Sequence, residues 1–597
     1  MAPADEYSSR LASWEAQARR SQALEARLGA IRLGLAALFV AAAWGAVGKH
    51  AFSALWLLAP AAAFVAAVLY HASVRRRHRR ATRAIELYRG GLARLEDRWA
   101  GGGDAGERFL DPHHVYSADL DLFGRGGLFE LVCAARTRMG EEALARWLLA
   151  PASREEIETR HACIRDLRDR LDLREDLAIL GDDAQAGVQP RSLLEWAETP
   201  NVLEQPWIRW AARLLPGLCA AAAAFWALSG NLIPFVAVVL AEVAVLYALK
   251  DRLKQVLDPT EGAFQDLRIF GGLLARLERE AFEASQMIAL VRSLASGGAE
   301  AARSIGRLST LAELAGSRDN MIVRAVSVLV VYSLLVALAA ERWRRAHGRK
   351  VRGWIETAGR LEALSSLARY AFEHPEDPLP RLVAEGAPRL AAVDLGHPLL
   401  PAARCVRNDV DLSGRTRVLL VSGSNMSGKS TLLRAVGINT VLAMAGAPVR
   451  ARSLELTPLQ VGTSIRISDS LAEGSSHFYA ELKRLEQLRE LSERGAPLGL
   501  PLLFLLDEVL QGTNSKDRRI GAEAIVRAFG KRGGIGLMST HDLALTEIEG
   551  LEPGSLRNVH FQDEIENGIM RFDFKLRDGV VEKSNGLALM RSIGLEV

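Results

Sequence analysis

The sequence has few cysteines, no recognisable cleavable leader and little excess charge. Its four cysteines are scattered over 597 residues, and no two of them have the spacing of a metal site or a disulfide framework. The first 28 residues are polar and charged, so we expect no cleavable signal peptide. The net charge of +4 argues neither for nor against nucleic-acid binding. The scattered cysteines predict reduced thiols. The length of 597 residues is enough for several domains.

Two long hydrophobic runs lie near the start, at 33–48 and 51–70, with Lys49 and His50 between them. The second run has 20 residues, enough to cross a hydrocarbon core of about 30 Å as a helix. Arginines crowd both outer flanks, so the positive-inside rule places both flanks in the cytoplasm. The alternative is a buried helical hairpin in a large soluble domain, because alanine-rich runs also occur in protein cores.

A second pair of hydrophobic runs, 214–228 and 232–249, is joined by a short polar turn and again has basic flanks. This pattern predicts another hairpin with both ends in the cytoplasm. Glu242 lies inside the fourth run, and we expect it to face a neighbouring helix or a polar cavity, because a carboxylate in lipid is costly. A fifth run, 323–340, continues into charged residues, so we predict a cytoplasmic helix there and no fifth crossing.

The rest of the N-terminal part has the periodicity of helices. Apolar positions recur every three or four residues through 128–150, and Pro151 predicts a helix end. We expect further helices over 260–315 and 321–372. After a proline-rich linker at 373–388, short apolar runs alternate with helical stretches, as in an α/β domain.

One stretch fits the phosphate-binding loop pattern G-x-x-x-x-G-K-[ST]. A strand is predicted before it, at 418–421, and a helix after it, at 432–436. Glycines let such a loop wrap around phosphates, which the backbone amides and the positive end of the helix attract. We expect Lys429 to reach the β and γ phosphates and the Ser430 hydroxyl to hold Mg²⁺. The alternative is a glycine-rich turn with a chance lysine. The ATP-binding residues of the stretch are Gly423, Ser424, Asn425, Met426, Ser427, Gly428, Lys429, Ser430 and Thr431.

Two further motifs carry candidate catalytic groups. An apolar run at 502–506 ends in Asp507 and Glu508, roughly 80 residues after the loop, as a Walker B strand would. Asp507 would hold Mg²⁺ and Glu508 would polarise the attacking water. His541 follows another apolar run, 535–538, and is a candidate sensor of the γ phosphate. The alternatives are an acidic strand end and a structural histidine.

Together these motifs resemble the MutS family of ABC-type ATPases. The loop is similar to the family's G-P-N-M-G-G-K-S-T, with Ser424 and Ser427 at the variant positions. Residues 474–482 are similar to G-x-S-T-F-x-x-E-[ML], with His477 in place of threonine. Residues 507–513 resemble D-E-[IL]-G-x-G-T, with Leu510 in place of glycine. The tail at 558–560 and 583–588 also matches, and residues 119–149 resemble the start of the MutS core.

The resemblance implies an α/β ATPase that uses ATP and Mg²⁺ and dimerises head to tail, with Ser476 reaching the γ phosphate held by the partner. It also implies binding of double-stranded, even mismatched, DNA. The family's mismatch-reading domain, with its Phe-x-Glu wedge, is not recognisable before residue 119, and neither are the connector and the DNA clamp. Phe129 and Glu130 are adjacent and do not form that wedge.

We therefore predict a multidomain, membrane-anchored MutS-like ATPase with an α-helical core and lever region, two transmembrane helical hairpins and a C-terminal α/β P-loop ATPase domain. It is expected in a membrane, most simply the bacterial inner membrane, with the ATPase domain in the cytoplasm. Its expected partners are a second copy, membrane lipid, DNA and an unidentified protein. The predicted segments are a cytoplasmic N-terminal helix (1–30), a first hairpin (31–72), a basic linker or helix (73–118), a MutS-core-like region (119–208), a second hairpin (209–250), lever-like helices (251–375) and the ATPase domain (376–597).

Two alternative functions use the same motifs. The first is an ATP-driven membrane switch or scaffold that acts on a protein partner and not on DNA. The second is half of an ABC transporter, which is disfavoured by only four expected spans and by the absence of the transporter signature L-S-G-G-Q.

Overall fold

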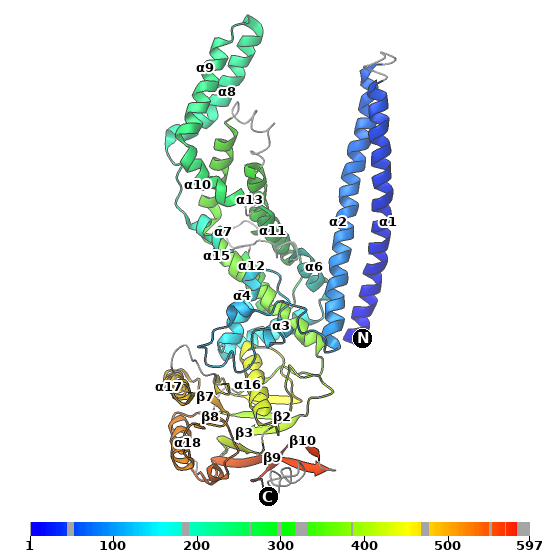
Figure 1. The fold of residues 1–597 in the computed structure, drawn as a ribbon. Coiled ribbons are helices and arrows are strands. Elements are labelled where there is room, and N and C mark those ends of the chain that lie inside the picture. Colours follow the sequence, from blue (N-terminus) through cyan, green and yellow to red (C-terminus); the bar gives the residue numbers. More distant parts are fainter. Residues whose placement is uncertain are drawn as a thin grey trace. The chain divides into compact units, whose positions relative to one another are not determined.

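The chain folds into two compact units. Unit 1 comprises Met1–Gly102 and Asp172–Asp182, and unit 2 comprises Gly103–Leu171 and Asp183–Val597. A helical N-terminal part and a C-terminal α/β part are both present, as predicted (Figure 1). The computed structural model describes residues 2–44, 53–181, 190–261, 264–294, 301–316, 331–383, 386–424, 426–466, 477–548, 552–566 and 569–581.

Unit 1 consists of two long helices and one short helix. Helices α1 (Pro3–Ala43) and α2 (Leu58–Leu95) pack along their length, with the short η2 (Ala54–Leu57) before α2. The third helix is α6 (Leu171–Gly181). Both long helices run through the segment boundaries that we set at residues 30 and 72. This is because neither the change from charged to apolar residues in α1 nor the reverse change in α2 interrupts the backbone hydrogen bonds.

Polar contacts fix α6 to the end of the α1–α2 pair that carries Tyr7 and Tyr88. The Tyr88 hydroxyl donates to the Glu175 carboxylate at 2.5 Å, and the Trp14 indole donates to it at 3.0 Å. Arg10 pairs with Asp172 at 2.6 Å. Because Tyr88 and Glu175 are both largely buried, these bonds are stronger than they would be in water.

Among the described residues, three helices are long and apolar enough to cross a membrane, by length and composition: α1, α2 and α8 (Pro206–Ser229). A fourth span is formed if α9 (Ile233–Ala248) and the start of α10 (Lys250–Glu261), which meet at a 66° bend, count as one. These helices contain most of the four hydrophobic runs that we assigned to hairpins; residues 45–48 and 51–52 of the first two runs lie outside the described residues. The fifth run ends in the first turns of α15, and its residues 323–330 lie outside the described residues.

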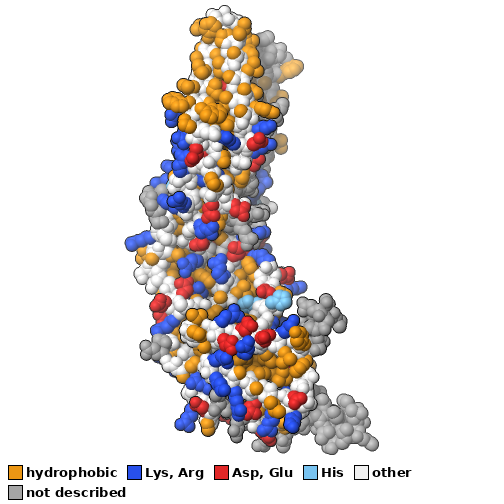
Figure 2. All heavy atoms as spheres, turned by 90° about the vertical axis from the view of Figure 1, so that its left-hand side faces the viewer, with side chains coloured by type: hydrophobic (Ala, Val, Ile, Leu, Met, Phe, Trp, Pro, Cys, Tyr) orange, Lys and Arg blue, Asp and Glu red, His pale blue; other side chains and the backbone are white. Residues whose placement is uncertain are grey.

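Helices α8 and α9 form the second hairpin, joined by the predicted turn. Gly230 in this turn has φ +71°, a left-handed conformation that glycine adopts without steric cost. Large apolar side chains are exposed along both helices, including Leu228 at 90% and Ile233 at 76%. Figure 2 shows this end of unit 2 as mostly apolar, with few charged side chains. Glu242 is fully buried near Cys219 of α8, so it faces a helix neighbour as predicted.

The helical part of unit 2 is organised along α15 (Tyr332–Glu373), which contacts most of the other helices of this unit. The helical periodicity over 128–150 corresponds to two helices, α3 and α4, and the second ends at Leu149, just before Pro151 as predicted. Cys133 is extended, and Thr137 restarts the helix as an N-cap that accepts from the Gly140 amide at 3.3 Å. The remaining helices are α3 (Leu128–Val132), α4 (Arg138–Leu149), α5 (Arg154–Arg168), α7 (Pro190–Glu198), α11 (Phe264–Glu278), α12 (Ser285–Leu294) and α13 (Ala301–Gly316), with the short η3 (Glu107–Phe109).

Helix α15 crosses α4 closely because glycines lie at the crossing. A Cβ atom at Gly140 would lie 2.7 Å from the Cβ atom of Glu362, and one at Gly359 would lie 2.6 Å from the Met139 carbonyl oxygen. Glu362 is buried there and accepts a hydrogen bond from the Thr137 hydroxyl. Burial raises the pKa of Glu362 to about 7, and it does the same for the pKa of the neighbouring Glu141.

The C-terminal part contains two mixed sheets. One has the strand order β1-β5-β2-β3, and the other has the order β10-β9-β4-β8-β7-β6. In the six-stranded sheet only β10 runs antiparallel to its neighbour. Strands β4, β7 and β8 are buried along their whole length, as their apolar runs predict. Their carboxyl ends therefore lie at one edge of the sheet, and the loops that follow them meet there.

The bounds of these elements are as follows. The strands are β1 (Arg381–Leu382), β2 (Leu390–Leu395), β3 (Asn408–Leu412), β4 (Val418–Ser422), β5 (Ser453–Leu456), β6 (Gln460–Ser464), β7 (Leu502–Leu506), β8 (Ile535–Thr540), β9 (Leu556–Glu566) and β10 (Ile569–Asp578). The helices are α16 (Lys429–Ala445), α17 (His477–Gly495), η5 (Ala496–Leu498), α18 (Ser515–Gly530) and η6 (Leu543–Glu547).

The raised pKa of Glu362 makes stability depend on pH. Because the folded pKa is about 7 and the ordinary carboxyl pKa lies near 4.5, the folded state holds this proton more tightly than the unfolded state. Stability is therefore greatest below the ordinary pKa and falls as the pH rises through 7. In the wild type, this proton loss should lower the free energy of unfolding by about 2 kcal/mol between pH 5 and pH 8. We expect the Glu362→Gln variant to lack this decrease. Melting temperatures over this pH range check this, with the exposed Glu356→Gln on the same helix as the control; equal pH slopes for the two variants would contradict it.

Candidate functional site

Residues 423–431 connect β4 to α16, as the sequence pattern requires. Gly423 has φ +151° and Gly428 has φ +106°, both in the region that favours glycine. A Cβ atom at Gly423 would lie 2.8 Å from the Ser427 hydroxyl oxygen, so no larger residue fits without a shift. Gly428 is the N-cap of α16, which places Lys429 and Ser430 in the first turn of the helix. Asn425 lies outside the described residues.

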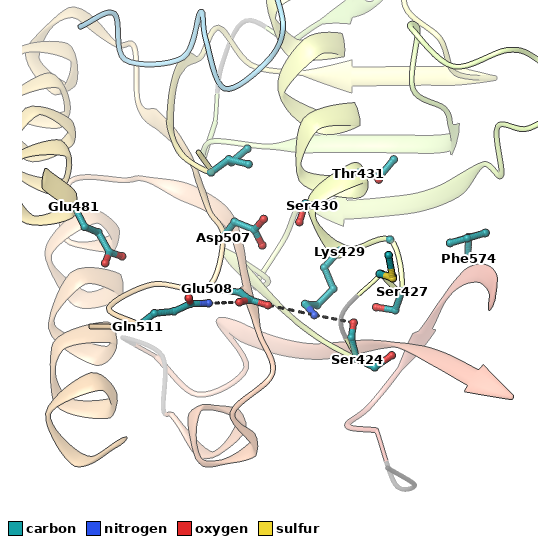
Figure 3. Close-up of a pocket in the computed structure, with 13 residues that line it drawn as sticks. Ser424, Ser427, Lys429, Ser430, Thr431, Glu481, Asp507, Glu508, Gln511 and Phe574 are labelled. Carbon is teal, nitrogen blue, oxygen red and sulfur yellow. Dashed lines mark hydrogen bonds and ion pairs between the residues drawn. The ribbon is translucent and has the colours of Figure 1, made fainter. Parts of the chain in front are cut away.

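The Lys429 side chain lies between the loop and the end of β7. Its ammonium group donates to the carbonyl oxygens of Gly423 at 2.8 Å and Ser424 at 2.9 Å. It also lies 3.6 Å from a carboxylate oxygen of Glu508, and Figure 3 shows the two side chains pointing toward one another. Burial lowers the pKa of Lys429, while the charges of Glu508 and Asp507 act in the opposite direction.

Asp507 and Glu508 follow β7 and are held by the neighbouring strand β8. The Ser539 hydroxyl donates to the Asp507 carboxylate and accepts from the Glu508 amide at 3.0 Å. Glu508 has φ +50°, a strained conformation for a residue with a side chain. Nδ1 of His541, directly after β8, lies 3.4 Å from the Glu508 carboxylate. Residues predicted from three separate motifs therefore lie within contact distance of Glu508.

These groups surround a cavity of about 470 Å³ (Figure 3). Its size and its mixture of one buried cation, hydroxyls and carboxylates suit a phosphorylated ligand. The hydroxyl oxygens of Ser424 and Ser427 are buried, and within the described part of the chain neither has a hydrogen-bond partner. His541 is absent from the lining, although it contacts Glu508. The lining residues are Ser424, Met426, Ser427, Gly428, Lys429, Ser430, Thr431, Ile465, Glu481, Asp507, Glu508, Gln511 and Phe574.

Phe574 is a site residue that the sequence did not reveal. The pairing of β10 with β9 shifts register between Phe572 and Leu576, and Phe574 has φ +54° within this irregularity. Its side chain lines both the 470 Å³ cavity and an adjoining cavity of about 170 Å³. The second cavity has apolar walls that include Leu432 and Phe561. No motif marks Phe574, because a bulge in a strand far along the chain brings it to the loop.

Helices α17 and α18 hold the turn that follows Glu508. Glu481 of α17 is buried and accepts from the Leu510 amide at 2.6 Å. Arg518 of α18 donates to the Leu510 and Gln511 carbonyl oxygens, each at 3.2 Å. Leu510 has φ +59°, which is strained, but its side chain is buried in the core between α17 and α18. Burial of this leucine offsets the loss of the glycine that the family pattern has at this position.

The helical part of unit 2 is tied to the end of β6 by Asp119. Its buried carboxylate accepts from the Thr463 hydroxyl at 2.6 Å and from the amides of Ile465 and Arg466 at 3.0 and 3.1 Å. Asp121 adds an ion pair with Arg466 at 2.5 Å. The chain then enters residues 467–476, which include Ser476 and lie outside the described residues, as does the predicted tail motif at 583–588.

The residues that could hold a divalent ion are Ser430 and Asp507, both of which line the cavity. Within the described ranges, no three His, Cys, Asp or Glu side chains form a group that could bind a metal by themselves. A hydroxyl, one carboxylate and waters suit Mg²⁺, which binds through few protein ligands together with substrate phosphates. The donor set therefore fits Mg²⁺ bound together with a nucleotide.

Comparison with known proteins gives matches over the C-terminal part of the chain. Residues 419–596 match the family model for MutS domain V. The chain is 34% identical over 209 residues to the DNA mismatch repair protein MutS of Nitratidesulfovibrio vulgaris, which covers 33% of this chain and 22% of that protein. It is 35% identical over 194 residues to MutS of Shouchella clausii, covering 32% and 21%. It is 33% identical over 207 residues to endonuclease MutS2 of Thermus thermophilus, covering 33% and 25%. The match thus spans about a quarter of the relatives' length or less.

The Asp119 contacts predict a local loss of stability when the carboxylate is removed. Asp119→Ala leaves the Ile465 and Arg466 amides without their acceptor, at a cost of about 2 kcal/mol or more. Hydrogen–deuterium exchange of a peptide covering residues 463–466 should then be faster by about 30-fold, because local opening becomes easier. The exposed Glu486→Ala on α17 serves as the control and should leave this exchange unchanged. Unaltered exchange in Asp119→Ala would show that these contacts do not hold the end of β6.

Proposed function

Residues 419–596 make this chain a member of the MutS family, and from that premise we propose that it is a membrane-anchored ATPase that hydrolyses ATP at a dimer interface. The observation that carries the proposal is the convergence of Lys429, Asp507 and Glu508 on one cavity beside a loop with two left-handed glycines. Phosphates in this cavity would meet the loop amides, the Lys429 ammonium group and the positive end of α16.

Each cavity residue has a proposed role in hydrolysis. Lys429 would bind the β and γ phosphates, exchanging its contacts with loop carbonyl oxygens for phosphate oxygens. Ser430 and Asp507 would hold Mg²⁺, whose chemistry is to neutralise charge on the phosphates. Glu508 would accept the proton of the attacking water, in a position fixed by the Ser539 bond to its amide. His541 lies against the same carboxylate and would orient it or contact the γ phosphate.

The adjoining apolar cavity is the proposed site for the adenine ring. It shares Gly428, Thr431 and Phe574 with the phosphate cavity, so one ligand can occupy both. A flat aromatic base suits a cavity walled by Leu432, Phe561 and Phe574.

The proposed dimer completes each site with Ser476 from the second copy. Ser476 lies five residues before Glu481, whose carboxylate holds the Leu510 amide in the turn after Glu508. A movement of Ser476 on contact with the partner's γ phosphate would therefore be transmitted to Glu508 through Glu481 and Leu510. This connection gives the two sites a physical route by which each responds to the nucleotide of the other.

The membrane part of the proposal is supported by helix composition. Helices α1, α2 and α8, and the bent pair α9–α10, have the length and hydropathy of spans. We place the ATPase part in the cytoplasm, where ATP is available. Helix α15 would carry the motion of the ATPase part to the α8–α9 hairpin, since it contacts α4, α5 and α8.

Substitutions in the site test the ATPase. Glu508→Gln should lower kcat at least about a hundredfold, because it removes the general base. Lys429→Ala should weaken ATP binding and turnover, and Ser476→Ala should lower turnover. The exposed Lys516→Ala is the matched control for loss of a lysine. Phosphate release from the detergent-solubilised chain measures all four variants.

A mixing experiment tests the shared site. When Ser476→Ala and Glu508→Gln chains are combined, one site of each mixed dimer has both an intact Glu508 and an intact Ser476. Activity should therefore rise above that of either variant alone. Unchanged turnover in Ser476→Ala, with abolished turnover in Glu508→Gln, would contradict the shared site and leave a one-chain ATPase.

The relatives named DNA mismatch repair protein suggest DNA as a further ligand of this chain, and we propose that it binds double-stranded DNA. A gel shift of the solubilised chain against homoduplex, mismatched and branched DNA should show binding that weakens steeply as salt rises, because phosphate contacts release counterions. Absence of salt-dependent binding would contradict the DNA role. An ATP-driven switch that acts on a protein partner would then be the remaining function for the same ATPase.

A further inference from the structure

Unit 1 carries a concentrated set of arginines that neither the ATPase site nor α6 uses. Helices α1 and α2 are antiparallel, and a residue of α1 lies beside the residue of α2 whose number is about 96 minus its own. Two contacts fix this alignment: the Tyr7 ring lies against the Tyr88 ring, and the Glu25 carboxylate lies 3.9 Å from the His71 ring nitrogen. We call this set the basic belt; its members are Arg19, Arg20, Arg27 and Arg32 on α1 and Arg75, Arg76, Arg77 and Arg79 on α2.

The basic belt is almost free of acidic residues. Over residues 16–32 and 64–80, which lie side by side, Glu25 is the one acidic residue. Within the described residues, no belt arginine forms an ion pair with a carboxylate. Arg80, directly below the belt, differs because Asp176 of α6 pairs with it at 2.5 Å. Seven of the eight belt side chains are exposed, and Arg32 is half-buried. Such a single-sign surface attracts an extended anionic partner.

The same two helices place the belt beside a strongly apolar surface. Leu69 is 66% exposed and Tyr70 is 50% exposed, and Arg75 follows only five residues after Tyr70. On α1, Leu33 is 75% exposed directly after Arg32. At 1.5 Å per residue, the arginines from 75 to 79 lie about 7–14 Å from the exposed apolar side chains. The headgroup layer beside the hydrocarbon core is about 5–8 Å thick, so Arg75 lies near its outer edge and the long arginine side chains can reach back into it. By the alignment above, Arg27 and Arg32 lie level with residues 69 and 64, directly beside the apolar surface.

We propose that the basic belt binds the headgroups of anionic phospholipids on the cytoplasmic face of the membrane. The inference rests on the membrane placement of α1 and α2 proposed above and adds a lipid specificity to it. Guanidinium groups bind phosphate oxygens through paired hydrogen bonds, and clusters of four to eight basic residues beside a span are suited to anionic lipid. DNA phosphates offer the same chemistry, but a duplex in this place would lie against the apolar surface of Leu33 and Leu69.

Native mass spectrometry of the detergent-solubilised full chain tests this directly. The chain is titrated with phosphatidylglycerol or with phosphatidylcholine, and the bound lipids are counted at several salt concentrations. We expect tighter binding of phosphatidylglycerol that weakens with salt. The combined Arg75→Gln, Arg76→Gln, Arg77→Gln and Arg79→Gln variant should lose at least tenfold in phosphatidylglycerol affinity and nothing in phosphatidylcholine affinity, since each basic residue near an anionic surface contributes about fivefold.

Two control variants separate lipid binding from folding. Replacement of the same four arginines by lysine keeps the charge and should preserve the phosphatidylglycerol preference within about threefold. Replacement of four exposed arginines of unit 2 by glutamine should change neither lipid affinity; these are Arg146, Arg279, Arg292 and Arg415.

Three outcomes would overturn parts of the inference separately. Equal binding of the two lipids, or equal phosphatidylglycerol binding by the glutamine variant and the wild type, contradicts the lipid site. If the glutamine variant loses DNA binding in a gel shift but keeps phosphatidylglycerol, the belt is a nucleic-acid surface. If alkaline carbonate releases the chain from membranes without detergent, the proposed spans are contradicted. If the chain stays in the membrane but binds phosphatidylglycerol and phosphatidylcholine equally, only the lipid site is contradicted.

Discussion

The candidate site depends on the parallel pairing of β4, β8 and β7. Residues Val418, Gly536 and Phe504 lie in register across these strands, so the three strands end together at one edge of the sheet. The loops after them bring Lys429 and His541, which are far apart in the sequence, to the same Glu508 carboxylate. Neither Lys429 nor Glu508 could contact the other without this pairing, because each comes from a different loop.

The parallel sheet also explains which parts of the site were predictable. An apolar run followed by Asp507 and Glu508, or by His541, marks a strand that ends at the functional edge, and all three residues lie there. The adjacent groups arise from pairing that leaves no local pattern. Phe574 reaches the loop through a bulge between β9 and β10, and Asp119 reaches the end of β6 across more than three hundred residues. Ser539 belongs to no motif of the sequence, yet it holds both acidic residues.

Helix positions were predicted better than helix ends. Hydrophobic runs located α1, α2, α8 and α9, because a continuous apolar stretch has few other stable conformations. The charged and apolar segments on either side of residue 30 belong to one helix, α1, because both form the same backbone hydrogen bonds. The helical periodicity over 128–150 locates the helix end before Pro151 but does not show the break between α3 and α4. Apolar periodicity persists across Cys133 and Thr137, while the Thr137 side chain bonds the Gly140 amide and starts a new helix.

The position of α6 has a consequence for the way the chain can be divided. The chain passes from unit 1 to unit 2 after Gly102, returns to unit 1 for residues 172–182, and then leaves it again. Unit 1 is therefore not an appendage that can be separated by a single cut near residue 102. Such a cut would strip α6 of Tyr88 and Trp14 and leave the buried Glu175 carboxylate without its two donors. A chain without the first hairpin would therefore also need a changed surface on α6, to replace the donors to Glu175.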